Sequence, residues 1–159
     1  MIDYSNHIES RLLTWNQLEK QLSLWRFKNQ KIAFTNGCFD LIHQGHIDYL
    51  AKAASFGNQL IIGLNTDDSV KRLKGVERPI NHQYARAKVL SALIFTSAVV
   101  LFDQDTPLEL IQLIEPDILV KGGDYHLNEV VGKEFAKETK IIPLTPGFST
   151  TQTLEKLKR

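Results

Sequence analysis

Cysteine and unbalanced charge are what this sequence most clearly lacks. It has one cysteine, Cys38, in 159 residues, which excludes an internal disulfide framework and a multi-cysteine metal site and favours a reducing, cytoplasmic setting. Its 19 basic and 18 acidic residues give a formal net charge of +1, so no overall field would hold it on nucleic acid or an anionic membrane. We expect neither partner, and any bound anion must be held locally.

Long hydrophobic runs are missing as well. The most apolar stretch, residues 92–102, is interrupted by Thr96 and Ser97 and falls short of the roughly 20 residues that span a bilayer. The first residues include Asp3 and Glu9 without an apolar run, which is not the pattern of a signal peptide. With 43% hydrophobic residues, the length predicts one globular domain.

The order of apolar patterns predicts an α/β fold. Thr14 to Gln17 has the form of a capping box, and Leu18, Leu22 and Trp25 follow at helical spacing, so we assign residues 1–30 to an N-terminal helical extension. Residues 31–159 alternate between short apolar runs at 32–35, 60–65, 98–102, 118–121 and 141–144 and helical patterns at 45–56, 66–73, 82–95, 107–114, 128–137 and 150–158. This predicts a single three-layer, Rossmann-like domain with a five-stranded parallel sheet.

The segment after the first predicted strand has the residues for phosphate chemistry. It contains His43 and His46 three residues apart at the opening turn of a helix, on one face and near the positive end of the helix dipole. Backbone N–H groups and two imidazoles would converge there on one anion, while Gly37 and Gly45 allow close backbone approach.

Two other interpretations of this segment are weaker. A zinc site lacks a convincing third ligand, because Cys38 and Asp40 precede the helix, so we expect no protein metal site. Covalent catalysis by Cys38 lacks a specified activating base, and a packed loop thiol is the simpler interpretation. We interpret Asp40 as supporting structure that orients the loop or a histidine.

The pattern Gly-x-Phe-Asp-x-x-His-x-Gly-His between a strand and a helix resembles the signature of the cytidylyltransferase-like nucleotidyltransferase superfamily. The resemblance runs from about Lys31 to the C-terminus. Residues 66–75 with Arg78-Pro79, residues 121–125 and residues 146–151 resemble the branch that activates heptose 1-phosphate for lipopolysaccharide assembly, in its stand-alone form without a sugar kinase. The resemblance implies transfer of AMP from ATP to D-glycero-β-D-manno-heptose 1-phosphate, giving ADP-heptose and pyrophosphate.

The residues of the site divide into three sets. Basic residues on helices are as readily solvated as bound to ligand, but Lys74, beside Gly75, is placed to close over phosphate. Mg²⁺ carried by the triphosphate and a homodimer or higher oligomer are also implied by the resemblance. We assign catalysis to His43, His46 and Lys74; nucleotide binding to Asn36, Gly37, Cys38, Phe39, Asp40, Gly45, Arg86, Lys121, Gly122, Asp124, Ser149, Thr150 and Thr151; and sugar-phosphate binding to Lys71, Arg78 and Tyr125.

Two alternatives stay open. A sister enzyme would use CTP with glycerol 3-phosphate or a related alcohol phosphate, but glycerol-phosphate relatives have an arginine shortly before the Ser149-Thr150-Thr151 element, where this chain has Leu144-Thr145-Pro146-Gly147. A protein of another class would bind adenine nucleotide without turnover as a regulatory module, although the intact histidine pair argues against it.

Overall fold

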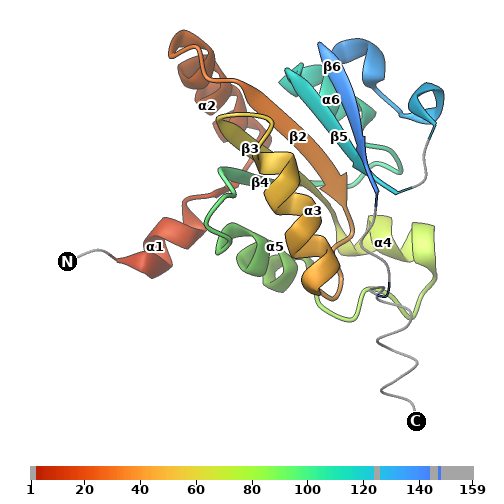
Figure 1. Cartoon of the computed structure of the whole chain (residues 1–159). Coiled ribbons are helices and arrows are strands. Elements are labelled where there is room, and N and C mark those ends of the chain that lie inside the picture. The colour runs from red at the N-terminus through yellow and green to blue at the C-terminus, as the bar shows by residue number, and fades with distance from the viewer. Residues whose placement is uncertain (1–2, 124–125, 144–146, 148–159) are drawn as a thin grey trace.

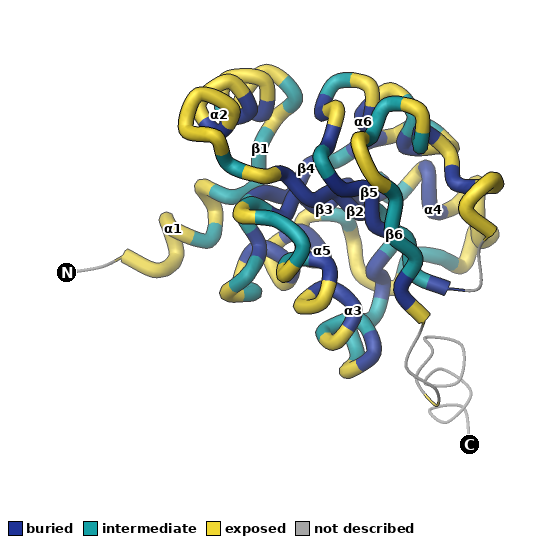
Figure 2. The backbone as a smooth tube through the Cα atoms, turned by 45° about the horizontal axis from the view of Figure 1, so that its top comes forward, coloured by how far each residue is buried: buried dark blue, intermediate teal, exposed yellow. Residues whose placement is uncertain are grey.

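The computed structural model describes residues 3–123, 126–143 and 147. Within them, six parallel strands form one sheet in the order β1-β4-β3-β2-β5-β6. Figure 1 labels β2 to β6, and Figure 2 labels β1 next to β4. The predicted parallel α/β fold is confirmed, with one strand more than the five expected. The strands are β1 (Leu12–Leu13), β2 (Ile32–Gly37), β3 (Gln59–Asn65), β4 (Ala98–Phe102), β5 (Ile118–Gly122) and β6 (Glu138–Ile142).

Helices join these strands and cover the sheet. The helical segments are α1 (Tyr4–Glu9), α2 (Trp15–Phe27), α3 (Gln44–Ala54), α4 (Asp67–Lys74), α5 (Gln83–Ser91) and α6 (Leu108–Ile114), with short 3₁₀ turns at Leu127–Glu129 and Lys133–Phe135. None of the helices in the described ranges is long and apolar enough to cross a membrane.

Two apolar layers lie on opposite faces of the sheet. On one face α2 and α6 contribute Leu22 and Ile111 to a cluster with Phe34 of β2. On the other face α3 and α5 contribute Leu50 and Leu90 to a second cluster. Figure 2 shows the buried strands between these two helical layers. The strands are buried on both sides because the crossover helices of parallel strands cover both faces of the sheet.

The strand that the sequence pattern missed belongs to the N-terminal segment. β1 pairs with β4, and the helix after it begins with the expected capping box of Thr14 and Gln17. The indole Nε1 of Trp15 donates a hydrogen bond of 2.9 Å to the Leu101 carbonyl of β4. Residues 12–27 are therefore attached both to the sheet and to the core beneath α2.

Two predicted elements near the C-terminus need correction. The helix expected at 128–137 is wrong: the chain forms two 3₁₀ turns there. Between them lies Gly132 at φ 80°, where an added Cβ would lie 2.7 Å from Ile111. The last strand covers Glu138–Ile142 rather than 141–144. The helix expected at 150–158 lies outside the described residues.

The strand order places a switch point at the centre of the sheet. From β2 the chain builds outward through β3 to β4, and then crosses to β5 and β6 on the other side of β2. Neighbouring connections leave β2 and β5 in opposite directions, which opens a crevice at the carboxyl ends of these two strands. That crevice receives the loop that contains the paired histidines.

Candidate active site

A cavity of about 460 Å³ lies at the carboxyl ends of β2, β3 and β5. Most of the expected nucleotide residues come together in its wall, as do several residues that the sequence analysis did not identify. Those it missed include Tyr49, Asn65, Thr106, Pro107, Val130 and Val131. The expected residues that line the cavity are Asn36, Gly37, Cys38, Phe39, Asp40, His46, Lys74, Lys121 and Gly122.

A tyrosine beneath the cavity connects β2, α3 and β5. The Tyr49 hydroxyl shares a hydrogen bond with the Thr35 hydroxyl and donates to the Val120 carbonyl at 3.2 Å. Burial raises the pKa of Tyr49 to about 12, although the bond from Thr35 opposes this shift. A Cβ on Gly122 would lie 2.9 Å from the tyrosine ring. The floor of the site is thus a neutral, tightly packed junction in which a side chain at residue 122 would have to displace the Tyr49 ring.

The two histidines stack on each other at the start of α3. Their ring centroids are 3.8 Å apart, and Phe39 contacts the His46 ring edge-on at 5.4 Å. His43 is the N-cap of α3, and its backbone N–H donates to Nδ1 of His46 at 3.4 Å. Because Nδ1 accepts, a neutral His46 has its proton on Nε2. His46 lines the cavity wall, so Nε2–H is the donor that this ring offers to a ligand.

The environment keeps both imidazoles uncharged. Burial lowers the pKa of His46 to about 4, with smaller electrostatic contributions from His43 and Lys74 that oppose a second positive charge. Burial also lowers the pKa of His43. Both imidazoles are therefore uncharged at neutral pH, a state in which each ring has one N–H to donate.

The loop before the histidines is held in an uncommon conformation. Phe39 has φ 43°, in the left-handed region that residues other than glycine rarely adopt. A Cβ on Gly37 would lie 2.9 Å from the Phe39 ring, so a larger residue at this position would have to displace the ring. This packing places Phe39 against His46 and brings the backbone of Gly37 to the cavity.

Asp40 fixes the loop of residues 75–82 to the histidine loop. Its carboxylate is 3% exposed; it accepts from Arg78 Nε at 2.6 Å and from the backbone N–H groups of Ile80 and Asn81. Burial alone would raise the pKa of Asp40, but the N–H groups of Asn81 and Ile80 and the Arg78 guanidinium lower it below its usual range. Asp40 is thus an ionised anchor between the two loops, and its assignment to nucleotide binding stays a prediction.

The expected basic residues occupy different positions relative to the cavity. Lys74 and Lys121 line it, and Lys121 Nζ donates to Asn36 Oδ1 at 3.3 Å across the switch point. Burial lowers the pKa of Lys121. Lys71 instead pairs with Asp68 on the surface, Arg78 with Asp40, and Arg86 is buried. The roles of Lys71, Arg78 and Arg86 in ligand binding stay predictions.

The Cys38 thiol has the properties of a packed group. It lines the cavity, and its Sγ lies 3.9 Å from Oδ1 of Asn65. Burial raises the pKa of Cys38, against the lowering influence of Lys74 and Arg86. The protonated thiol is a poor nucleophile, which fits the packed interpretation.

Some expected residues cannot be placed. Asp124, Tyr125, Ser149, Thr150 and Thr151 lie outside the described residues. Across the part of the chain that is described, no group of three or more His, Cys, Asp or Glu side chains is arranged to hold a metal ion.

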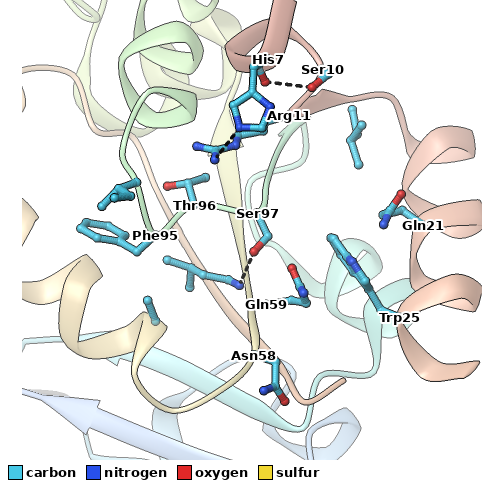
Figure 3. Close-up of a pocket in the computed structure, with 14 residues that line it drawn as sticks. His7, Ser10, Arg11, Gln21, Trp25, Asn58, Gln59, Phe95, Thr96 and Ser97 are labelled. Carbon is cyan, nitrogen blue, oxygen red and sulfur yellow. Dashed lines mark hydrogen bonds between the residues drawn. The ribbon is translucent and has the colours of Figure 1, made fainter. Parts of the chain in front are cut away.

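A second cavity, of about 490 Å³, lies at the amino ends of β3 and β4 (Figure 3). Its polar wall is largely structural: Arg11 Nη1 donates to the Ser91 and Leu93 carbonyls at the end of α5, and Ser97 Oγ accepts from the Leu60 N–H. None of the expected site residues lines it. The cavity at the carboxyl edge is therefore the candidate active site.

The sheet is doubly wound, and the N-terminus of α3, which is suited to bind phosphate, lies at its switch point. These two features are typical of nucleotide-binding α/β proteins. The chain belongs to the cytidylyltransferase-like family, whose sequence model matches residues 34–155. This family membership and the similar proteins described next identify a nucleotidyltransferase.

Proteins named "Bifunctional protein HldE" are similar in sequence. The one from Helicobacter hepaticus is 54% identical over 153 residues, which cover 96% of this chain and 31% of that protein. The one from Wolinella succinogenes is 51% identical over 150 residues, covering 94% of this chain and 32% of that protein. The chain thus spans about a third of the length of these relatives.

Two solved structures share the fold. A lipopolysaccharide core biosynthesis protein from Thermoplasma volcanium has a TM-score of 0.61 at 24% identity, covering 73% of this chain and 97% of that one. Pantoate-beta-alanine ligase from Francisella tularensis, in complex with beta-gamma ATP and beta-alanine, has a TM-score of 0.62 at 14% identity, covering 92% of this chain and 76% of that one. At these identities the likeness concerns the fold alone.

Proposed function

We propose that this chain transfers AMP from ATP to D-glycero-β-D-manno-heptose 1-phosphate, releasing pyrophosphate and forming ADP-heptose for lipopolysaccharide synthesis. The observation that supports it most is the stacked, neutral histidine pair at the start of α3, of which His46 lines one cavity together with Lys74 and Lys121. Donors, cations and a helix start at one crevice suit a polyphosphate. The similarity to the HldE proteins supports the choice of acceptor.

In the proposed reaction a phosphate oxygen of the sugar phosphate attacks the α-phosphorus of ATP in line, and pyrophosphate leaves from the opposite side. No protein nucleophile is needed, so catalysis consists of alignment and stabilisation of charge on the non-bridging oxygens. His46 would donate from Nε2 to these oxygens, and Lys74 would stabilise the leaving phosphates. Removing one such donor costs about 3 kcal/mol, or about a hundredfold in rate.

The nucleoside would lie at the switch point beside β5. Asn36 and Lys121 are already joined there by a hydrogen bond, and Gly122 lines the same cavity. Asp124 and the hydroxyls of Ser149, Thr150 and Thr151 complete the proposed nucleotide contacts, and Tyr125 those of the sugar.

We also propose that ATP enters as its magnesium complex. The ion would offset the charge of the phosphates, and such ions commonly bind substrate oxygens and water rather than a protein cage. The carboxylate of Asp40 is occupied by Arg78 and two backbone N–H groups, so we assign no described side chain to the ion. A homo-oligomer, a cytoplasmic setting and a division into residues 1–30 and 31–159 are further parts of the proposal.

The proposal is tested by measuring pyrophosphate release with ATP and with CTP, each against heptose 1-phosphate and glycerol 3-phosphate. We expect turnover with ATP and heptose 1-phosphate. Turnover with CTP alone, or with glycerol 3-phosphate alone, would refute the assignment in favour of the sister activity. The double variant His43→Ala/His46→Ala is the control: unchanged turnover in that variant would remove the histidines from the mechanism.

A further inference from the structure

Arg86 is 2% exposed, and it is the largest of the fully buried side chains among the described residues. It does not line the active-site cavity, although it lies on α5 near that edge of the sheet. A buried cation is costly unless its donors are matched by acceptors. The bonds of Arg86 therefore indicate why the fold retains it.

The guanidinium of Arg86 bonds to four separate segments of the site. Nη1 donates to the Cys38 carbonyl at 2.7 Å and to the Asn65 carbonyl at 2.9 Å. Nε donates to the Asn81 carbonyl at 2.8 Å, and Nη2 donates to the Asp67 carboxylate at 2.7 Å. These acceptors belong to the histidine loop, the end of β3, the loop before α5 and the first residue of α4.

The planar fork of arginine suits this arrangement. Five N–H groups in fixed directions can bond to several acceptors at once, whereas a lysine ammonium is a single point on a flexible stem. Since Cys38 and Asp67 share one guanidinium, the start of α4 cannot move relative to the histidine loop without breaking a charge-assisted bond. Lys74 is the last residue of the same helix. Because an α-helix is rigid over this length, fixing its first residue, Asp67, also fixes the position of Lys74.

We propose that Arg86, with Asp67, is a positioning residue that sets Lys74 against the histidine loop and does not itself touch the nucleotide. This inference rests on the proposed function, because its main readout is the transfer of AMP. It replaces the sequence-based expectation of a direct nucleotide contact for Arg86. The Asp67 carboxylate is 27% exposed, so its bond to Arg86 can be removed with less damage to the core than the arginine itself.

The test is a double-mutant cycle with Asp67→Ala and Lys74→Ala, measuring kcat and the KM for ATP. A misplacement of about 1 Å at a reacting group can cost about a hundredfold in rate, so we expect Asp67→Ala to lower kcat by about tenfold or more. In the Lys74→Ala background, where no lysine remains to be placed, the same change should cost less than about threefold. The matched control is Lys88→Gln, since Lys88 is an exposed cation of α5 that pairs with Glu9; we expect wild-type kinetics.

Arg86→Lys gives a second measurement, which keeps the charge and loses the fork. We expect a fall in kcat on the order of a hundredfold with little change in ATP affinity. A raised KM for ATP at unchanged kcat would overturn the proposal, as would equal costs of Asp67→Ala in both backgrounds. If Arg86→Lys fails to fold, the double-mutant cycle of Asp67→Ala and Lys74→Ala still tests the positioning role. A wild-type chain without AMP transfer would instead refute the proposed function and leave the cycle to be run with the substrate pair that does react.

Discussion

The low pKa of His46 should make the folded protein lose stability as the pH falls from about 6.5 to about 4. Burial lowers the pKa of this imidazole from 6.5 to about 4. Between these pH values His46 is protonated in the unfolded chain and neutral in the folded chain. Stability therefore rises with pH across that window and is lost as the pH falls through it. Acidification from about pH 7.5 to about pH 5 should therefore lower the free energy of unfolding by about 2 kcal/mol. Solvent screening of this partly exposed ring reduces the expected loss to about 1–2 kcal/mol.

The assay is urea unfolding of the wild type and of His46→Gln at both pH values. Glutamine can still accept the His43 N–H but cannot titrate, so the variant should lose about 1–2 kcal/mol less than the wild type on acidification. NMR of the imidazole protons measures the same property directly in the folded protein. A His46 ring that titrates between about pH 6 and pH 7, with equal acid losses in both proteins, would refute the neutral-donor reasoning.

Three further changes test the surrounding structure. Asp40→Ala should lower the free energy of unfolding by about 3–5 kcal/mol in urea, because it leaves Arg78 and two backbone N–H groups without their acceptor. Cys38→Ala should keep kcat within about threefold, since a half-buried, protonated thiol is a poor nucleophile; loss of turnover would reopen covalent catalysis. Gly122→Ala should lower the midpoint of thermal unfolding through the contact with Tyr49, at a cost of about 1–3 kcal/mol; an unchanged midpoint would show that the ring can move aside.

The sequence pattern identified the central strands because they are buried on both sides and bounded by loop residues. It missed β1, since a pair of leucines, Leu12 and Leu13, is too short to show any period. It also placed a helix across residues 128–137, where apolar spacing was present but Gly132 takes a left-handed conformation against Ile111. Both errors arise where tertiary contacts, rather than local periodicity, decide the backbone.

The candidate site shows the same division. Residues near one another in sequence, such as Gly37, Phe39 and His46, were assigned together and do line one cavity. The partners of Arg78 and Arg86 could not be predicted. The sequence around a basic residue is the same whether its side chain contacts solvent, a ligand or a buried acceptor. Asp40 lies 38 positions from Arg78, and that separation carries no local signal.

The pairing of β1 with β4 has a consequence for how the molecule behaves in solution. Without Leu12 and Leu13, the outer side of β4 would present the backbone groups of Val99 and Val100 as a bare, apolar edge ready to add a strand from another molecule. Leu12 and Leu13 thus cover the edge of β4 and prevent strand pairing between molecules. A chain shortened past residue 13 should aggregate under conditions in which the longer chain stays in solution.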